Sequence, residues 1–343
     1  MFKVTVCVVV YNAIEHINEC LNSLLQQDYP RDLYEILVID NDSTDGTQER
    51  IQEFCNRAPH IRMLVNPIIG IAGSRNMGLR EARYDYVAFT DSDCVAPPQW
   101  LSRLVQGFER HRKRHNNLAS VGGSNVPPEN GDRFYNTLSI FLNTFLGSHG
   151  SVQGKRFDHD RVVPHIPTVN IMYHRKTVLQ AGGFDVTFGN IGEDQDMSYR
   201  LRHLGYTFVY LANCPVTHKL RPTRRAWLKN MRLYGKGRMW LMRKHPDNID
   251  VILLAPLVLV VSLPLSIFAA WHAIFFLPLL YFPLILLISA FECVRVGKPS
   301  SLLSLFGLYV GTHFAYGVGE IIGLFKNREM QKAALYTSQH ARN

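Results

Sequence analysis

The chain has 343 residues, of which 47% are hydrophobic and 19% charged, and it carries a formal net charge of +9 at pH 7. Its hydropathy divides it near residue 248 into a soluble part and an apolar part. The six cysteines show no C-x-x-C spacing, which argues against a structural zinc site and against a disulfide framework. No recognised nucleic-acid-binding motif accompanies the basic charge, so nucleic acid is not an expected partner.

Apolar strand-like segments alternate with helix-like segments in the first third of the chain. Strands are predicted at 4–10, 35–39, 61–65 and 86–89, and apolar residues at helical spacing follow the first strand within 14–27. This alternation predicts βαβ units and a mostly parallel sheet, which binds ligands at the carboxyl ends of its strands. The N-terminal segment has no long apolar region ending in a small-residue cleavage site, so it is expected to be a strand and not a signal peptide.

Polar residues follow three of these strands. They are residues 11–12, the segment DNDSTDGT at 40–47, and the pair Asp91 and Asp93. Because the carboxyl ends of parallel strands meet at one edge of a sheet, we expect these clusters to lie together. A D-x-D pair is a good ligand set for a hard divalent cation, although a polar turn after a strand would have the same sequence.

Three acidic residues occur close together in GNIGEDQDMSYRLRHLGY, namely Glu193, Asp194 and Asp196. The segment predicts a helix N-terminus, with Met197, Leu201 and Leu204 on the buried face. The helix dipole favours acids at this position, which is a sufficient structural explanation. Three acids within four residues nevertheless repel one another, and that repulsion is easier to explain if one of them does chemistry.

A basic segment precedes the apolar part of the chain. Residues 219–246 include ten Lys or Arg and no acid, which fits the cytoplasmic face of a membrane or contact with phosphates. Residues 251–291 then lack Asp, Glu, Lys and Arg entirely. As a helix they would extend about 60 Å, twice the thickness of a bilayer core. Two crossings with a turn near Trp271 and His272 fit that length.

A third apolar segment, 300–325, contains His313, Glu320 and five glycines, some at small-xxx-small spacing. It predicts either a full span or a half-buried interfacial helix. A full span would place the tail, with Lys326 and Arg328, on the face opposite the basic segment, where positive charge is disfavoured. The predicted organisation is a catalytic domain at 1–245, a membrane region at 246–330 with spans near 251–270, 273–291 and 300–325, and a tail at 331–343.

Five blocks resemble, in order, those of family 2 glycosyltransferases with the GT-A fold. They are VCVVVYNAIEHINECLNSLLQQDYP, ILVIDNDSTDGT, GIAGSRNMGL, YVAFTDSDCVAPPQWL and GGFDVTFGNIGEDQDMSYRLRHLGY. The resemblance covers about residues 4–240, and HFAYGVGEIIG is similar to membrane-attached, succinoglycan-type members that build exopolysaccharide or lipid-linked glycans. It implies a GT-A α/β domain with a Rossmann-like, mostly parallel sheet, followed by transmembrane helices. It also implies a nucleotide-sugar donor, with UDP as the favoured nucleotide.

The resemblance also implies which residues bind the donor. Asp40 would accept hydrogen bonds from the base or the ribose, beside the turn at Val10 and Tyr11. Asp42, like Thr44, could instead cap the helix that starts near Gly46. The basic residues after 230 could fold over the diphosphate or contact lipid headgroups. The implied donor-binding residues are Val10, Tyr11, Asp40, Asp42, Arg75, Asn76, Asp91, Ser92, Arg232 and Arg238.

The D-x-D pair of this family binds Mg²⁺ or Mn²⁺, which implies metal ligation by Asp93 and Asp91. The cation neutralises the departing diphosphate. His218 is a candidate third ligand, although a lone histidine is more often structural. By the same resemblance Asp194 is the general base and Glu193 holds the acceptor or the base in place. A single displacement would invert the anomeric centre.

The pair Glu193 and Asp194 favours a hydroxyl acceptor, which is expected to belong to a membrane-associated or lipid-linked glycan. A polyprenyl phosphate, the alternative acceptor, is already anionic and needs no base. The segment NMRLYGKGRMW departs from the Q-x-x-R-W motif of processive synthases, which indicates transfer of one or a few sugars. Thr168 and Asn170 lie where the family often lines the acceptor or sugar pocket. The apolar segment 134–150 predicts either a core helix or an interfacial helix that guides a lipid-linked acceptor.

The expected location is the cytoplasmic membrane, with several spans and the catalytic domain facing the cytosol. A non-catalytic membrane scaffold that kept the fold is the alternative from a different functional class. The oligomeric state is left open by the sequence.

Overall fold

The computed structural model describes residues 1–66, 70–129, 131–220 and 223–326, which divide into two units. Among the described residues, the first unit comprises Met1–Val126 and Ser151–Lys219, and the second comprises Pro127–Gly150 and the chain from Leu220 to Lys326. These bounds differ from the boundary predicted near residue 245. The hydropathy pattern places the basic segment 219–246 in the soluble part. In the structure, its apolar residues Trp227 and Met231 pack in the hydrophobic core of the helical second unit.

An eight-stranded sheet forms the centre of the first unit, in the order β3-β2-β1-β4-β9-β6-β10-β8. The four strands from β3 to β4 are parallel, as are β6 and β10, whereas β9 and β8 are antiparallel to their neighbours. The prediction of a mostly parallel sheet is confirmed. The strands are β1 (Val4–Val10), β2 (Tyr34–Asp40), β3 (Ile61–Val65), β4 (Tyr86–Asp91), β6 (Leu118–Gly122), β8 (Arg161–Val162), β9 (Asn170–His174) and β10 (Thr207–Tyr210).

Strand β1 shows why its sequence is apolar without alternation. Its valines 4, 6, 8 and 10 pack in one hydrophobic cluster, while Cys7, on the other face of the sheet, packs in a second cluster. Both faces of the central strands are therefore covered, which is typical of parallel sheets between helices. The helices of this unit are α1 (Ile17–Leu25), α2 (Thr47–Arg57), α3 (Ile71–Glu81), α4 (Trp100–Arg112), α7 (Arg175–Gln180) and α8 (Glu193–His203), with 3₁₀ turns η1 (Arg31–Leu33) and η2 (Val186–Phe188).

A second, three-stranded sheet in the same unit joins segments that lie far apart in the sequence. Its order is β5-β11-β7, and its strands are only two or three residues long. They are β5 (Cys94–Val95), β7 (Asn125–Val126) and β11 (Val216–His218).

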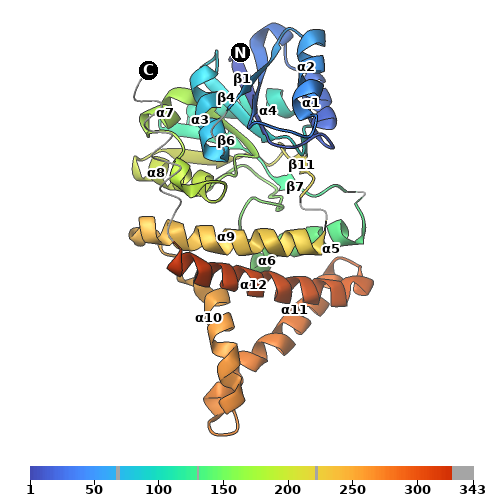
Figure 1. The fold of residues 1–343 in the computed structure, drawn as a ribbon, viewed down its shortest axis with the longest axis vertical. Coiled ribbons are helices and arrows are strands. Elements are labelled where there is room, and N and C mark those ends of the chain that lie inside the picture. Colours follow the sequence, from blue (N-terminus) through green and yellow to red (C-terminus); the bar gives the residue numbers. More distant parts are fainter. Residues whose placement is uncertain (67–69, 130, 221–222, 327–343) are drawn as a thin grey trace. The chain divides into compact units, whose positions relative to one another are not determined.

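The second unit is helical. Figure 1 shows α9 and α12 side by side, with α10 and α11 extending away from that pair. Its helices are α5 (Arg133–Leu142), α6 (Phe145–Ser148), α9 (Arg224–Lys244), α10 (Ala255–Ser262), α11 (Tyr281–Arg295) and α12 (Leu302–Phe325), with 3₁₀ segments η3 (Pro246–Asn248), η4 (Val251–Leu254), η5 (Leu263–Phe268), η6 (Ala273–Leu280) and η7 (Pro299–Ser301).

Three helical segments in the described part of the chain are long and apolar enough to cross a membrane. They are Val251–Phe268, Ala273–Arg295 and Pro299–Phe325, close to the three predicted positions. The first two are separated by a turn at Trp271 and His272, as the sequence predicted.

Helix α5 belongs to the core of the second unit. Leu138 and Phe141 are fully buried in a cluster that also contains Trp227 of α9 and Tyr309 of α12. Of the two interpretations of the apolar segment 134–150, the core helix is therefore correct for the part that forms α5.

Candidate active site

The carboxyl ends of β1, β2 and β4 lie next to one another at one edge of the large sheet. Val10 pairs with Asp40, and Val9 pairs with Asp91. Since neighbouring strands are about 4.8 Å apart, the two carboxylates lie one strand to either side of the end of β1. The prediction that these polar strand ends gather at one edge is confirmed.

The loops after β1 and β2 are joined by hydrogen bonds. The backbone N–H of Asn12 donates to Ser43 Oγ (2.8 Å), and that of Thr44 donates to Asn12 Oδ1 (2.9 Å). Asn12 and Asp42 have φ angles of 46° and 64°, which Asn and Asp tolerate better than most residues. Tyr11 is 58% exposed at the start of these loops, whereas Val10 before it is buried.

Asp40, at the end of β2, is buried with only one of its oxygens satisfied. Its Oδ1 accepts hydrogen bonds from the backbone N–H of Ser43 (2.8 Å) and from Gln48 Nε2 (2.9 Å). Its Oδ2 is buried without a hydrogen-bond partner among the described residues. An unsatisfied buried acceptor costs about 1–3 kcal/mol, so a ligand that donates a hydrogen bond to this oxygen would be favoured.

Asp42 and Thr44 do not cap α2. The helix begins at Thr47, and its N-cap residue, Gly46, makes no side-chain capping bond. Instead, Asp45 Oδ1 accepts from the backbone N–H (3.1 Å) and the hydroxyl (2.5 Å) of Thr47. The capping alternative for Asp42 and Thr44 is wrong because Asp45, which is closer to the helix, satisfies that N–H.

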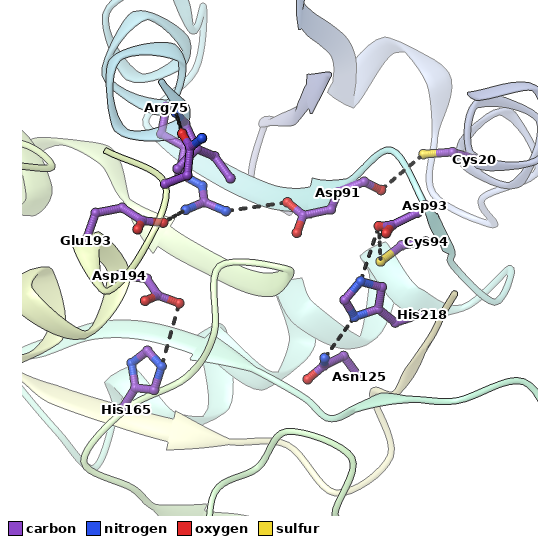
Figure 2. A network of polar contacts seen from close by, with 12 residues as sticks. Cys20, Arg75, Asp91, Asp93, Cys94, Asn125, His165, Glu193, Asp194 and His218 are labelled. Carbon is purple, nitrogen blue, oxygen red and sulfur yellow. Dashed lines mark hydrogen bonds and ion pairs between the residues drawn. The ribbon is translucent and has the colours of Figure 1, made fainter. Parts of the chain in front are cut away.

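Arg75 of α3 lies between two carboxylates from other elements (Figure 2). Its guanidinium is hydrogen-bonded to Glu193 of α8, and its Nη2 lies 3.4 Å from Oδ1 of Asp91 in β4. The Arg75 and Glu193 side chains are only 4% and 5% exposed. Burial raises the pKa of Glu193 to about 7, although Arg75 acts in the opposite direction. One buried cation therefore ties α3 to both β4 and α8.

We expect Arg75→Met to lower the free energy of unfolding by about 3–5 kcal/mol, because Glu193 would remain buried without its cation. The loss should be larger at pH 8 than at pH 5. A buried carboxyl whose pKa is raised above its unfolded value is tolerated when protonated and destabilises the fold as the pH rises through the folded pKa. Chemical unfolding at both pH values measures the effect. Arg80→Met, on the exposed side of the same helix, is the control, and equal losses in both variants would contradict this interpretation.

Asp93 and His218 face each other beside the end of β4 (Figure 2). Strands β5 and β11 pair in antiparallel fashion with His218 opposite Cys94, so the short sheet brings the histidine to the D-x-D turn. His218 Nε2 lies 3.2 Å from Asp93 Oδ1, and Cys94 Sγ lies 4.0 Å from the same oxygen. The ligand atoms of these three residues lie within 4.8 Å of one another. Asp91 is not part of this group of possible metal ligands, because its carboxylate faces Arg75. Ser92, between the two aspartates, is half-buried in the turn.

The chemistry of this group fits Mg²⁺ or Mn²⁺ through Asp93 and His218. A carboxylate suits both ions and an imidazole suits Mn²⁺. A thiolate suits softer ions than Mg²⁺ or Mn²⁺, so Cys94 is the least suitable ligand of the three. Asn125 Nδ2 lies 3.0 Å from His218 Nδ1, and Asn125 Oδ1 is buried without a partner in the described residues. With that amide rotated by 180°, its oxygen would accept from Nδ1–H and leave Nε2 for a metal.

Asp194, in the first turn of α8, lies next to His165. The His165 Nε2 atom is 3.7 Å from Asp194 Oδ2, and its Nδ1 is 2.9 Å from Ser198 Oγ. Asp194 Oδ1 accepts a hydrogen bond from the backbone N–H of Gln195 (2.8 Å). Both carboxylate oxygens thus have neighbours that orient them. Sequence reasoning missed His165, because a lone histidine in a loop carries no motif.

The other two acids of this helix turn have internal partners. Glu193 is bound to Arg75, and Asp196 is fully buried with its Oδ2 accepting from Arg200 Nε (2.9 Å). Asp194 is 21% exposed and is the acid of the three that a substrate could reach. The predicted burial of Leu204 is wrong: it is 60% exposed, because α8 ends at His203.

Three predicted binding residues are directed into the protein. Both amide atoms of Asn76 bond the backbone of Phe184, at 2.7 and 2.8 Å. Asn170 accepts from Trp100 Nε1 (2.8 Å) and donates to two backbone carbonyls. Thr168 is 1% exposed. The pocket role of Asn170 is corrected, because an amide whose donors and acceptor are all used inside the protein does not bind a sugar. The donor-binding role of Asn76 is corrected as well, because its amide oxygen and nitrogen both bond the backbone of Phe184 and the residue is buried.

Arg232 and Arg238 lie on α9, in the second unit. Arg232 is exposed, and Arg238 Nε donates to the hydroxyl of Tyr316 (3.2 Å). Their contact with a nucleotide stays a prediction.

Residues 5–180 match the family model for glycosyl transferase family 2. Glycosyltransferase AglE of Haloferax volcanii is 30% identical over 243 residues, which cover 70% of this chain and 74% of that protein. A Methanococcus voltae protein named dolichyl N-acetyl-α-D-glucosaminyl phosphate 3-β-D-2,3-diacetamido-2,3-dideoxy-β-D-glucuronosyltransferase is 24% identical over 256 residues, which cover 72% of this chain and 76% of that protein.

Among solved structures, the fold is similar to that of mannosyltransferase PcManGT from Pyrobaculum calidifontis in complex with GDP-Man and Mn²⁺. The TM-score is 0.64 at 19% identity, covering 94% of this chain and 87% of the other. GalNAc-T7 with UDP, GalNAc and Mn²⁺ gives a TM-score of 0.50 at 15% identity, covering 70% and 51%. At such identities the likeness concerns the fold alone.

Proposed function

Because the chain belongs to glycosyl transferase family 2, we propose that its first unit transfers a sugar from a nucleotide-sugar donor to a hydroxyl of a membrane-associated or lipid-linked glycan. The chain is a glycosyltransferase, and the predicted GT-A fold is confirmed. The finer likeness to succinoglycan-type enzymes stays a prediction.

The observation that carries the proposal is the unsatisfied Oδ2 of Asp40 at the same sheet edge as the D-x-D turn. A base N–H or a ribose hydroxyl would donate to this oxygen, and the exposed Tyr11 would flank the base. Asp91 and Arg75 would then lie between the nucleoside and the sugar. We infer UDP as the favoured nucleotide from the sequence resemblance. Because the complex of PcManGT contains GDP-Man, GDP-sugars belong in any test.

Asp93 and His218 would hold a divalent cation beside the donor diphosphate. Their 3.2 Å separation supports this assignment, and the two related structures named above contain Mn²⁺. When bound, the cation would supply positive charge where the departing diphosphate accumulates negative charge.

Asp194 would act as the general base. The acceptor hydroxyl would give its proton to Asp194 while its oxygen attacks the anomeric carbon. The bond from that carbon to the diphosphate oxygen would break, and its electron pair would leave with the nucleotide diphosphate. A single displacement of this kind inverts the anomeric centre. His165 would keep the Asp194 carboxylate oriented, and Glu193, bound to Arg75, would position the helix turn that carries the base.

The basic helix α9 and the apolar segments that follow it support a place in the cytoplasmic membrane, with the first unit in the cytosol. The glycan acceptor would be presented from the same membrane. The name of the Methanococcus relative describes a lipid-linked acceptor, which is consistent with this proposal.

The test is nucleotide release by the full chain in lipid nanodiscs, with UDP-, GDP- and dTDP-sugars and with Mn²⁺, Mg²⁺ or EDTA. We expect release from one donor, faster with metal and faster again with a lipid-linked glycan as acceptor. Faster release with a polyprenyl phosphate would favour the alternative acceptor. No release from any donor, even with membrane lipid extract added, would favour a non-catalytic scaffold.

A further inference from the structure

Helix α12 lies beside α9 along most of its length (Figure 1). Near the start of both helices, Arg224 Nη2 donates to the carbonyl of Gly307 (2.5 Å). Near their ends, Trp240 Nε1 donates to the carbonyl of Lys326 (2.8 Å). The contacts follow the same order in both segments, so the two helices run parallel.

The two helix backbones approach each other through glycines. A Cβ atom on Gly235 of α9 would lie 2.0 Å from the carbonyl oxygen of Tyr316. A Cβ atom on Gly319 of α12 would lie 2.0 Å from the carbonyl oxygen of Arg232. No side chain fits in such a space, so the small-xxx-small glycines of α12 serve its packing on α9.

Helix α9 is unsuited to the interior of a membrane. A Lys or Arg at the centre of a spanning helix is unfavourable because its charge must leave water for hydrocarbon. If α12 crossed the bilayer, α9 beside it would be drawn in with it, and several of its charges would enter the hydrocarbon. The 21 residues of α9 include no acid and eight cations: Arg224, Arg225, Lys229, Arg232, Lys236, Arg238, Arg243 and Lys244.

The hairpin that contains α10 and α11 has the opposite character. With a rise of about 1.5 Å per α-helical residue and about 2.0 Å per 3₁₀ residue, its two apolar segments are about 32 and 39 Å long, enough to span the 30 Å of a bilayer core. Large apolar side chains on it are exposed, among them Val258 (61%), Ile267 (76%) and Phe291 (66%). Trp271, at the turn, is 79% exposed, and tryptophan is favoured at the headgroup layer.

We propose that α9 and α12 lie together in the headgroup layer of one membrane face, and that only the α10–α11 hairpin crosses the bilayer, in two passes. The cations of α9 would contact anionic lipid headgroups. The exposed Leu303 (76%) and Phe325 (82%) of α12 would reach the edge of the acyl region. The interfacial alternative for the third apolar segment therefore replaces the full span.

This arrangement explains the charge of the C-terminal segment. After two passes the chain returns to the face it left, so the basic tail lies on the same face as α9. That segment includes Lys326, Arg328, Lys332 and Arg342 with one acid, Glu329, and the positive-inside rule favours the cytoplasmic face for it. A third pass would place it on the opposite face.

The test uses the full chain in sealed membrane vesicles of known orientation, with one site for a specific protease added before Met1 and another after Asn343. In the described residues, the candidate spans all follow Pro246, so Met1 marks the face of α9. We expect the two added sites to be cleaved from the same side. Cleavage from opposite sides would overturn the proposal, because it requires a third pass.

A second measurement tests the two passes. In the variant Trp271→Cys, a membrane-impermeant maleimide should label the new thiol only from the side opposite the termini. Val261→Cys is the matched control: it is 56% exposed in the structure but would lie in lipid, so it should not be labelled from either side. The unsubstituted chain, with its six free cysteines, gives the background. Labelling of residue 271 from the side of the termini would refute the crossing. Neither readout depends on transferase activity.

Discussion

Replacement of Asp194 by asparagine is expected to lower kcat for sugar transfer by about 10²–10⁴-fold while leaving the KM for the donor nearly unchanged. The amide keeps the size of the side chain and accepts the same backbone hydrogen bond from Gln195, but it cannot take the proton of the acceptor hydroxyl. The measurement is steady-state transfer to a lipid-linked acceptor with the donor identified by the nucleotide-release panel.

Two further variants separate a base from a merely structural acid. Asp158→Asn makes the same chemical change at an exposed position of the same unit and should leave kcat unchanged. His165→Asn should lower kcat by less than Asp194→Asn and shift the pH profile of kcat, because the imidazole acts only through the carboxylate 3.7 Å away. If the Asp194→Asn variant kept full activity, Asp194 would not be the general base.

The central strands could be predicted because β1 and β2 are apolar on both faces, and that pattern depends only on local sequence. The order of the remaining strands in the sheet could not be predicted from local sequence. Strand β9 is inserted between β4 and β6, and the two- and three-residue strands β5, β7 and β11 exist only through pairing with one another. His218 reaches Asp93 through that long-range pairing, so its position followed from the family resemblance and from no local pattern.

Local sequence also does not show whether a polar side chain at a strand end is available to a ligand. Asn170 and Asp40 both occur at strand ends, yet all donors and the acceptor of Asn170 are used inside the protein, while Asp40 keeps one unsatisfied oxygen. Sequence identifies the residue type at a sheet edge, but the partner atoms decide whether it is free for a ligand. Helix α9 was likewise assigned to the soluble part by its charge, because hydropathy averages over the apolar face that carries Trp227 and Met231.

Because Asp93 is proposed to hold the cation, its replacement by alanine is expected to abolish activation by Mn²⁺ or Mg²⁺ and to lower kcat/KM by about 10³-fold, since several kcal/mol of charge stabilisation would be lost. The fold should be retained, since the backbone carbonyl of Asp93 still accepts the N–H of Lys219 (2.9 Å) and β5 still pairs with β11. Thermal unfolding and steady-state kinetics with Mn²⁺, Mg²⁺ and EDTA measure these effects, and Asp32→Ala, at an exposed position, is the control.

Calorimetric binding of the donor nucleotide separates a metal ligand from a residue that binds the nucleotide directly. In the unsubstituted protein, Mn²⁺ should tighten binding; in Asp93→Ala, Mn²⁺ should have little effect, while binding in EDTA should equal that of the parent protein. The reason is that the proposed contacts of the nucleotide with Asp40, at the end of β2, and with Tyr11, after β1, do not involve the D-x-D turn. If binding in EDTA falls as well, Asp93 contacts the nucleotide itself, and the pair with His218 is not the metal site.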